Sequence, residues 1–347
     1  MLTFVATIYR SKLKTVKAII PVAGAGTKLR PLTYTQPKAL IPIGGKTILG
    51  VIVEQLLEAG VTEFVFVIGY LGEKIQRYIE RQYPEVKASF VTQNDRKGTG
   101  HAICLTRQAV GDDEVMIVLG DTVCDYNLKE VLASPVSMIG VKKVDDPRSF
   151  GVAEINDKDQ VTRMVEKPLI PKSNMAMVGI YYIKESKKMF DTLETHLTQS
   201  PDQNGEYQLT SALQRMIEEG VPMNAFRVNN WFDCGKKESL LSTNAILLKQ
   251  AEEGHKIEDS NNYTNTVIIH PVNIGSGCTI NNSIVGPNVT IGEQSKVESS
   301  IVKDSIIGSY AELHHVVLNS SIIGSDAFVR GLSQSLNIGD NTEIDLA

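Results

Sequence analysis

From about Val267 to the end of the chain, an aliphatic residue followed by glycine recurs at a nearly constant spacing. The five pairs that define the spacing begin at Ile274, Ile291, Ile307, Ile323 and Ile338. The steps between them are 17, 16, 16 and 15 residues, each close to three hexapeptides. A hexapeptide period is typical of a parallel β-helix, in which every coil buries its aliphatic side chains against the next. The repeat therefore predicts a left-handed parallel β-helix domain over residues 267–347.

The preceding part of the chain alternates strand and helix patterns. Apolar, β-branched runs that predict strands lie at Val16–Ala23, Phe64–Ile68, Ala88–Thr92 and Val115–Leu119. Helical periodicity lies at Lys46–Ala59, Glu73–Gln82, Gly100–Val110, Tyr207–Glu219 and Lys236–Gly254. Such alternation predicts an α/β domain with a doubly wound, mostly parallel, Rossmann-like sheet and ligands at the carboxyl ends of its strands. We expect this domain at residues 15–254 and a polar linker at residues 255–266.

Charge and cysteine usage limit the environment and the partners. The net charge of −5 gives no reason to expect nucleic-acid binding, which would favour a basic face, and no apolar run approaches the length of a membrane span. The four cysteines contain no closely spaced pair, so we expect reduced thiols in a cytoplasmic protein. Residues 1–14 lack the apolar run and cleavage site of a signal peptide, and we interpret them as an accessory arm or a start-site artefact.

A loop of small residues follows the first predicted strand. It consists of Gly24, Ala25, Gly26 and Thr27, and Lys28, Arg30 and Lys38 follow it. Glycine lets backbone N–H groups face an anion, and the cations can neutralise further negative charge, so the loop suits a polyphosphate. It matches neither common phosphate loop. Leu29-Arg30-Pro31 stands where a dinucleotide fingerprint needs its third glycine, and a Walker A loop would need glycine at Leu40.

This stretch closely resembles the signature of the sugar-1-phosphate nucleotidyltransferases, the NDP-sugar pyrophosphorylases. The family pattern is G-x-G-T-R-L-x-P-L-T followed by P-K-x-L, and this chain contains GAGTKLRPLT and QPKAL. Lys28 stands where the family usually has arginine, so the charge is kept and the planar bidentate fork is lost. The glucose-1-phosphate thymidylyl- and uridylyltransferases are the members that the chain resembles, including those with a C-terminal β-helix.

The resemblance assigns roles to residues along the chain. It implies that Lys28 and Lys38 contact the nucleotide phosphates, together with Gly24, Ala25, Gly26 and Thr27 of the loop. It implies that Asp121 and Asp233 bind Mg²⁺; each follows an apolar run, although a single aspartate in that place is usually a turn residue or a helix cap. In Glu166-Lys167-Pro168 it implies that the lysine binds the sugar phosphate and the glutamate binds sugar hydroxyls.

Further matches concern the sugar and the base. Gly151 and Gly179 match glycines that leave room for the hexose, although a β-bulge or close packing explains them equally well. Gln93, Gly98 and Thr99 match the segment that reads the base in pyrimidine-specific members. There a glutamine amide can pair with both the N3–H group and a carbonyl of uracil or thymine. His101, in the same segment, is more often a packed helix residue than an acid or base.

These residues suit nucleotidyl transfer, which joins a sugar-1-phosphate to the α-phosphorus of a nucleoside triphosphate and expels pyrophosphate. The nucleophile is already an anion, so catalysis requires positioning, charge neutralisation and Mg²⁺ and needs no activating base. We predict transfer from dTTP or UTP to a hexose-1-phosphate, with glucose-1-phosphate favoured, by a homo-oligomer. Mannose-1-phosphate guanylyl transfer, a non-catalytic regulatory subunit and acyl transfer by the β-helix remain open alternatives.

Overall fold

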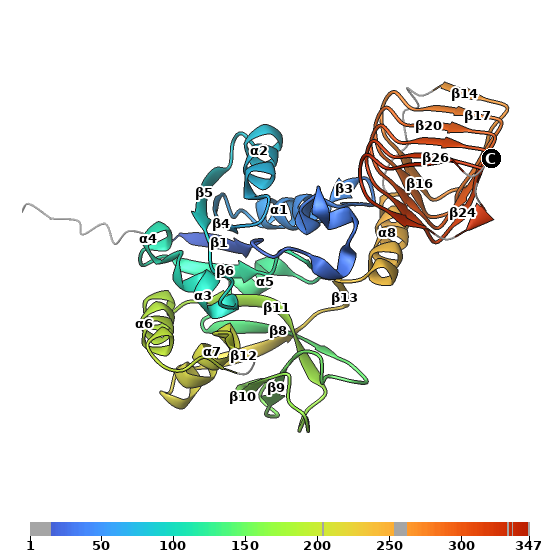
Figure 1. Cartoon of the computed structure of the whole chain (residues 1–347). Helices are drawn as coiled ribbons and strands as arrows, with labels where there is room; N and C mark the ends of the chain where they lie inside the picture. The colour runs from blue at the N-terminus through green and yellow to red at the C-terminus, as the bar shows by residue number, and fades with distance from the viewer. Residues whose placement is uncertain (1–14, 203–204, 253–261, 332, 335, 346–347) are drawn as a thin grey trace, which may run out of the picture.

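The computed structural model describes residues 15–202, 205–252, 262–331, 333–334 and 336–345. The segment 1–14 and most of the predicted linker lie outside these residues. An α/β domain forms the first part of the described chain, and a prism of short strands forms the last part (Figure 1). Among the described helices, none has the length and apolar character needed to cross a bilayer.

A nine-stranded sheet is the framework of the α/β domain. Its strands are β1 (Val16–Pro21), β4 (Glu63–Ile68), β5 (Lys87–Thr92), β6 (Glu114–Val118), β8 (Ser137–Lys143), β9 (Gly151–Ile155), β10 (Val161–Glu166), β11 (Met175–Ile183) and β12 (Met223–Arg227). The main path runs β10-β9-β11-β6-β1-β4-β5, and β8 pairs with β11 and β12. Strands β6, β1, β4 and β5 are parallel, whereas β11 is antiparallel to β6, β8 and β9. The predicted doubly wound sheet is confirmed, and its later half is mixed.

Two hydrophobic cores cover the two faces of this sheet. The helices are α1 (Ile48–Glu58), α2 (Gly72–Gln82), α3 (Thr99–Cys104), α4 (Arg107–Val110), α5 (Leu128–Leu132), α6 (Ser186–Leu197), α7 (Leu209–Glu218) and α8 (Lys237–Glu252). Because successive strand residues point to opposite faces, Ile20 packs with α1 and α2 while its neighbour Ile19 packs with α3, α6 and α7. Both side chains are fully buried.

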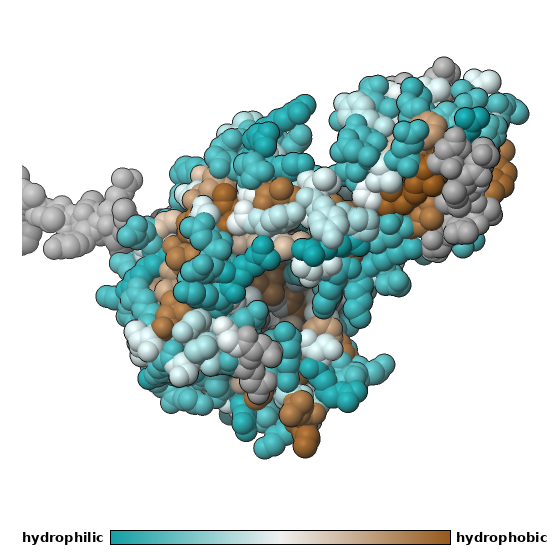
Figure 2. Space-filling model, in the orientation of Figure 1, coloured by the Kyte–Doolittle hydropathy of each residue, from teal (hydrophilic) through white to brown (hydrophobic). Residues whose placement is uncertain are grey.

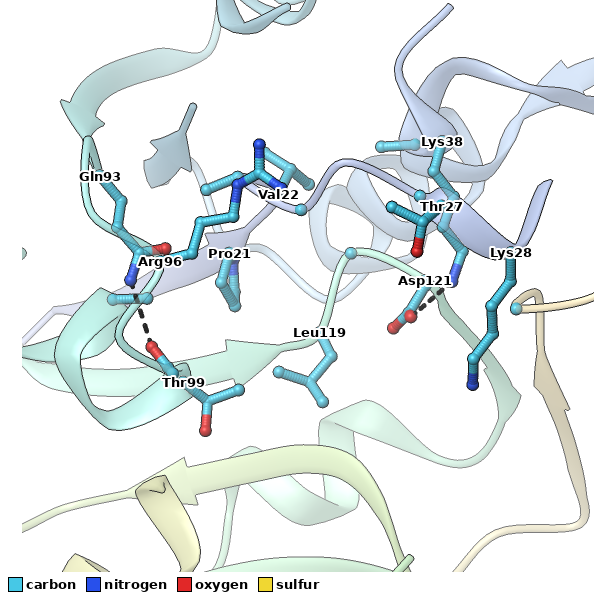
Figure 3. A pocket seen from close by; sticks show the side chains of 18 of the residues that line it. Pro21, Val22, Thr27, Lys28, Lys38, Gln93, Arg96, Thr99, Leu119 and Asp121 are labelled. Atoms are coloured by element: carbon cyan, nitrogen blue, oxygen red, sulfur yellow. Dashed lines mark hydrogen bonds and ion pairs between the residues drawn. The ribbon is translucent and has the colours of Figure 1, made fainter. Parts of the chain in front are cut away.

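One predicted helix is divided. The sequence predicts a continuous helix at Gly100–Val110, but α3 ends at Cys104 and α4 begins at Arg107. The hydroxyl of Thr106 donates a hydrogen bond to the carbonyl of Ile103 at 2.7 Å, which gives the backbone an alternative to continued α-helix. The break leaves α3 as a short helix whose first turn faces the carboxyl end of β1 (Figure 3).

A small ribbon joins two distant parts of the chain at the edge of the sheet. Strand β7 (Thr122–Asp125) pairs antiparallel with β13 (Asn230–Asp233), and Thr122 is the partner of Asp233. The amide of Cys234 donates to the carbonyl of Asp121 at 3.1 Å. This register brings Asp121 and Asp233 to the same end of the ribbon. Short elements after the first loop are η1 (Thr27–Leu29), η2 (Leu32–Tyr34), η3 (Lys38–Leu40), β2 (Pro42–Ile43) and β3 (Lys46–Thr47).

The C-terminal strands form three parallel sheets, as the repeat predicts. The first sheet contains β14 (Asn262–Thr264), β17 (Thr279–Asn281), β20 (Lys296–Glu298), β23 (Glu312–His314), β26 (Phe328–Arg330) and β29 (Glu343–Asp345). The second contains β15 (Val267–Ile268), β18 (Ile284–Val285), β21 (Ile301–Lys303), β24 (Val317–Asn319) and β27 (Ser333–Gln334). The third contains β16 (Val272–Ile274), β19 (Val289–Ile291), β22 (Ile306–Ile307), β25 (Ile322–Ile323) and β28 (Asn337–Ile338). Each strand pairs with its equivalent in the next coil, which confirms a β-helix.

The first strand of the β-helix lies within the range 255–266 that the sequence predicts as a linker. Strand β14 pairs with β17 through Asn262 and Thr279, so this part of the range belongs to the first coil. The polar run around β14 contains no aliphatic-glycine pair. The sequence repeat therefore starts after the first strand of the β-helix and does not predict it. We propose that the β-helix begins at Asn262.

The two domains share a continuous interface. Ile306 and Ile322 of the third sheet are fully buried in the same hydrophobic cluster as Leu240 of α8. The buried Asn244 accepts hydrogen bonds from the amide of Gly44 at 2.8 Å and from the hydroxyl of Thr290 at 2.6 Å. The α/β domain and the β-helix are therefore packed together rather than joined by a tether alone, and α8 lies between them (Figure 1).

Candidate active site

The loop after β1 has a conformation that requires glycine at one position. Gly26 has φ of 60°, and a Cβ atom there would lie 2.9 Å from Cγ2 of Thr33 and 3.1 Å from Cβ of Lys38. The hydroxyl of Thr33 also donates to the carbonyl of Gly26 at 2.8 Å. The loop is thereby folded against the segment that carries Lys38, which explains how cations separated along the sequence face one site.

A cavity of about 510 Å³ opens at this loop, at the carboxyl ends of β1 and β6. We call it the first cavity. Of the residues predicted to bind the nucleotide, those that line it are Gly24, Gly26, Thr27, Lys28, Lys38, Gln93, Gly98 and Thr99. Ala25 is buried beside them and does not line the cavity. Figure 3 shows Gln93 at one end and Lys28, Lys38 and Asp121 at the other, and the surface is hollowed between the upper and lower parts of this domain (Figure 2).

Two carboxylates and two ammonium groups form a charged cluster at one end of the first cavity. Nζ of Lys38 lies 2.6 Å from Oδ2 of Asp121. Removal of water by the surrounding protein raises the pKa of Asp233, and the negative charge of Asp121 raises it further, while Lys38 and Lys28 act in the opposite direction. All four groups therefore interact electrostatically, although Asp121 and Asp233 are 112 residues apart. The β7–β13 ribbon is the element that closes this distance.

A second cavity of about 250 Å³ adjoins the first. It is lined by the predicted sugar-phosphate residues Gly151, Glu166, Lys167 and Gly179. Thr99, Leu119, Asp121 and Asp233 line both cavities, so the carboxylate pair stands at their border. This arrangement provides two adjoining spaces with negative charge between them and lysines on both sides.

Glu166 and Lys167 are oriented differently although they are adjacent. Oε2 of Glu166 accepts a hydrogen bond from the hydroxyl of Thr210 at 2.8 Å, which fixes the carboxylate at the cavity wall. Lys167 has a positive φ of 42°, and its amide donates to the carbonyl of Phe150 at 3.1 Å. Its Nζ lies 3.7 Å from Oε1 of Glu166, and the side chain is about half exposed. The lysine is therefore free to turn toward an anion in the second cavity.

Local packing limits both glycines of the second cavity, more strictly at Gly179 than at Gly151. A Cβ atom on Gly151 would lie 2.4 Å from Cε of Met177, and one on Gly179 would lie 2.6 Å from Cδ1 of Leu119. Gly179 also has φ of 82° at a point where the register between β11 and β8 shifts. Local packing and the positive φ are sufficient to explain Gly179. At Gly151 the close contact is with the end of a flexible methionine side chain, so both explanations that the sequence leaves open still apply there.

The environment of Gln93 differs from the sequence-based expectation that both ends of its amide meet the base. The side chain is 7% exposed, and Nε2 donates to the carbonyl of Gly98 at 3.2 Å. Nε2 also lies 3.0 Å from Nδ1 of His101. Burial lowers the pKa of His101, and the nearby charge of Lys97 adds to this effect. The nitrogen of the Gln93 amide is thus already bound within the protein.

Several residues of the two cavities have no predicted role from the sequence. They are Arg96 and Gly235 in the first cavity and Trp231 in the second. Glu206, Thr210 and Tyr181 also line these cavities, and they belong to the stretches EYQLT and VGIY, which resemble family motifs. Arg96 lies in the charged loop between Gln93 and Gly98. Trp231 precedes Asp233 by two residues on β13, so strand alternation places Trp231 and Asp233 on one face. The ring of Trp231 packs edge-on against Phe150 at a centroid distance of 4.7 Å. The charge of the loop around Arg96 and the spacing of Trp231 from Asp233 could both have been recognised in the sequence.

Comparison with protein families agrees with this geometry. Residues 17–250 match the nucleotidyl transferase family, and residues 249–345 match the GlmU-like C-terminal hexapeptide family. The chain belongs to the nucleotidyl transferase family. The family resemblance predicted from the GAGTKLRPLT stretch is thereby confirmed, and the chain is a nucleotidyltransferase of the sugar-1-phosphate type.

Characterised relatives are similar along different parts of the chain. The low-salt glycan biosynthesis nucleotidyltransferase Agl11 of Haloferax volcanii is 33% identical over 67% of this chain and 66% of its own length. A glucose-1-phosphate thymidylyltransferase of Streptomyces griseus is 29% identical over 89% of this chain and 92% of its own length. A solved UDP-glucose pyrophosphorylase in complex with UDP-glucose superposes with a TM-score of 0.59 and 25% identity, covering 68% of this chain and 99% of that structure.

Proposed function

We propose that the protein transfers a nucleotidyl group from dTTP or UTP to a hexose-1-phosphate, with glucose-1-phosphate as the favoured acceptor. The observation that carries this proposal is the pair of adjoining cavities with Asp121 and Asp233 at their border. One cavity has a phosphate loop and the size for a nucleotide, and the other offers a hydroxyl acceptor beside a cation. The α-phosphorus and the attacking sugar phosphate would meet at the border.

The residues around this border suit the charge changes of the reaction. A phosphate oxygen of the sugar-1-phosphate forms a bond to the α-phosphorus while the bond to the β-phosphate oxygen breaks, and pyrophosphate leaves with the electron pair. We assign Lys28 and Lys38 to the triphosphate and Lys167 to the sugar phosphate, because they lie on opposite sides of the carboxylates. Holding two polyanions in line is the main requirement, and fixed cations supply it.

The carboxylate pair fits a magnesium site. Burial raises the pKa of Asp233 most, and the negative charge of Asp121 raises it further. A divalent cation bound between the two carboxylates would offset both the lost hydration and this repulsion. Among the described residues no group of three or more His, Cys, Asp or Glu side chains gathers. The remaining ligands would be phosphate and water oxygens, as Mg²⁺ prefers. Bound Mg²⁺ would hold carboxylate and phosphate oxygens together and offset the charge of the phosphates.

The choice of base and sugar is supported by position and by the relatives. Gln93 lies at the end of the first cavity farthest from the charged cluster (Figure 3). A base placed there would leave its triphosphate reaching toward Lys28. Two of the similar proteins described above, the glucose-1-phosphate thymidylyltransferase and the UDP-glucose pyrophosphorylase, are named for a pyrimidine nucleotide and for glucose.

We further propose that the β-helix mediates assembly of identical subunits. Its third sheet packs on the catalytic domain, and its first sheet carries charged side chains such as Lys296 and Glu312, which form an ion pair at 2.7 Å. The second sheet instead presents an aliphatic ladder that runs through successive coils. Its members and their exposed fractions are Val267 (55%), Ile284 (37%), Ile301 (43%) and Val317 (45%).

A continuous exposed aliphatic strip on a flat sheet is characteristic of a protein–protein contact. On the face shown in Figure 2, apolar surface is visible on the β-helix, whereas the outer surface of the catalytic domain is mostly hydrophilic. Because the strip repeats the same side chains at each coil, an identical strip on a second copy offers a self-complementary surface.

The catalytic proposal is tested by a pyrophosphate-release screen. Each of dTTP, UTP, CTP, GTP and ATP is combined with glucose-, mannose-, galactose- and N-acetylglucosamine-1-phosphate in the presence of Mg²⁺. We expect turnover with UTP or dTTP and a hexose-1-phosphate, and dependence on added Mg²⁺. Turnover confined to GTP and mannose-1-phosphate would replace the proposal with guanylyl transfer. Absence of turnover with every pyrimidine triphosphate would reject it.

A further inference from the structure

The Gln93 side chain lies between the first cavity and a fixed pair of hydrogen-bond acceptors. Gln93 and Gly98 line the cavity, whereas His101 does not. On the protein side, the amide nitrogen of Gln93 faces the carbonyl of Gly98 at 3.2 Å and Nδ1 of His101 at 3.0 Å. In Figure 3 the amide nitrogen of Gln93 points away from Arg96, and its oxygen is turned toward the Arg96 side of the cavity.

The chemistry of these partners determines the orientation of the amide. A carbonyl oxygen only accepts, so the NH₂ end of Gln93 must face Gly98. The NH₂ group only donates, so Nδ1 of His101 must carry a lone pair, and its proton must be on Nε2. The two hydrogens of the amide nitrogen are then both used within the protein, and only the oxygen remains for the base.

The first acceptor is held rigidly by the backbone. Gly98 has φ of 98°, and a Cβ atom there would lie 2.5 Å from the carbonyl oxygen of Tyr207. The amide of Gly100 donates to the carbonyl of Tyr207 at 2.8 Å, and the amide of Tyr207 donates to the carbonyl of Lys97 at 2.7 Å. The loop is therefore fixed on both sides of Gly98. Among the described residues, the imidazole of His101 is the side chain that reinforces this orientation, through its 3.0 Å contact with Nε2 of Gln93.

We propose that His101 is a positioning residue that holds the Gln93 amide with its oxygen toward the cavity, and that it thereby selects pyrimidines whose N3 carries a hydrogen. The inference rests on the proposed function, because it takes the first cavity as the nucleotide site. Uracil and thymine have an N3–H group, which the oxygen of Gln93 accepts. Cytosine has a lone pair at N3, which would face that oxygen without a hydrogen between them. A buried acceptor left without a donor costs enough to discriminate by about tenfold to a hundredfold.

The test compares UTP with CTP, two substrates of equal size. The ratio of their kcat/KM values is measured with a saturating hexose-1-phosphate for the unchanged protein and for His101→Leu, His101→Gln and His314→Leu. We expect the ratio to fall about tenfold in His101→Leu, chiefly through KM, because the amide loses one of the two acceptors that fix it. His101→Gln restores a carbonyl acceptor and should recover most of the ratio. His314→Leu, the same change in the β-helix, should leave it unaltered.

A spectroscopic measurement separates positioning from a general effect on the fold. The imidazole ¹⁵N shifts of His101 in the free protein should show Nδ1 unprotonated and Nε2 protonated at neutral pH. A proton on Nδ1, or a UTP/CTP ratio that does not change in a folded His101→Leu protein with turnover, would overturn the inference and leave the proposed function intact. Absence of pyrimidine turnover in the unchanged protein would instead reject the proposed function.

Discussion

Replacing Asp233 by asparagine removes one negative charge from the charged cluster while preserving the shape of the side chain. In the unchanged protein the carboxylates of Asp121 and Asp233 face the ammonium groups of Lys28 and Lys38. Asp121 is already paired with Lys38 at 2.6 Å, so Asp233 is the carboxylate with more charge available for a divalent cation. The substitution changes the formal charge of the four groups from zero to plus one.

The size of the effect follows from Coulomb's law. A unit charge and a divalent ion about 4 Å apart interact with about 8 kcal/mol at an effective dielectric constant of about 20. The asparagine oxygen keeps part of this attraction as a dipole, and water and phosphate oxygens replace a further part, so we take about half as lost. A loss of about 4 kcal/mol of transition-state stabilisation corresponds to about a thousandfold decrease in kcat/KM.

The assay is steady-state pyrophosphate release over a range of Mg²⁺ concentrations, with Asp191→Asn as the matched control. Asp191 is a carboxylate on α6 that pairs with Arg107 at 2.6 Å, outside both cavities. We expect Asp233→Asn to lose about a thousandfold at ordinary Mg²⁺, with partial recovery at high Mg²⁺, and Asp191→Asn to lose less than about twofold. More than about a tenth of normal turnover in Asp233→Asn at ordinary Mg²⁺ would refute the assignment.

The raised pKa of Asp233 also predicts how Asp233→Asn changes the stability of the metal-free protein with pH. Because this pKa is raised in the folded protein, the unfolded state loses its proton first as the pH rises. The ionised group therefore destabilises the metal-free fold above its folded pKa, and this penalty disappears as the pH falls below the unfolded value. Asp233→Asn should raise the Tm of the metal-free protein at neutral pH, and the gain should vanish in acid. An unchanged Tm at neutral pH would contradict the coupling.

Further predictions concern the lysines and the β-helix. Lys167→Ala should raise the KM for the sugar phosphate at least about tenfold with little change in that for the triphosphate, and the reverse pattern would show that the cavities are assigned to the wrong substrates. Lys28→Arg restores the residue usual in the family and should keep or modestly raise kcat/KM, so an inactive folded variant would contradict the loop geometry. Ile301→Lys should lower the molecular mass of the assembly in solution without changing the circular dichroism, and an unchanged mass would exclude the aliphatic ladder as the interface. Asp340 of the β-helix accepts a hydrogen bond from the hydroxyl of Thr35 at 2.5 Å, and Thr35 lies three residues before Lys38. Asp340→Ala removes this acceptor and should raise the KM for the triphosphate a few-fold. Unchanged kinetics would show that the β-helix does not support the phosphate-binding segment.

Most of the fold follows from periodicity in the sequence. The β-helix is evident because each coil repeats the same aliphatic ladder, so one period predicts many strands at once. Strands β1, β4, β5 and β6 are evident because each is a short β-branched run between turn signals. Helix α6 gives a weaker signal, since Met189, Phe190, Leu193 and Leu197 are the large apolar residues in the otherwise mostly polar run Ser186–Leu197.

The sequence identified most of the candidate residues that line the two cavities, but it did not identify the contacts between them. The sequence places Asp121 and Asp233 each after an apolar run, and nothing in it says that β7 and β13 pair. The same holds for the hydrogen bonds that orient the Gln93 nitrogen, since they depend on how the Gln93 side chain lies against the Gly98 carbonyl and the His101 side chain. Long-range pairing is set by the whole fold rather than by local pattern.

The contact between the domains was also hidden from the sequence. Ile306 and Ile322 have the spacing of ordinary β-helix residues, yet they are buried with Leu240 of α8. A polar linker predicts that the catalytic domain folds alone when the chain is cut after Gly254, and the shared cluster shows that this domain would then lose hydrophobic contacts. Truncation would expose this apolar surface, so we expect the shortened protein to be less stable as well as differently assembled.

The central claim is that the phosphate oxygen of a hexose-1-phosphate attacks the α-phosphorus of a pyrimidine triphosphate. It is tested most directly with hexose-1-phosphate that carries ¹⁸O in its non-bridging phosphate oxygens, followed by mass spectrometry of both products. The proposed reaction retains all of the label in the β-phosphate of the NDP-sugar and leaves pyrophosphate unlabelled. Label in pyrophosphate, or release of pyrophosphate without formation of an NDP-sugar, would contradict it.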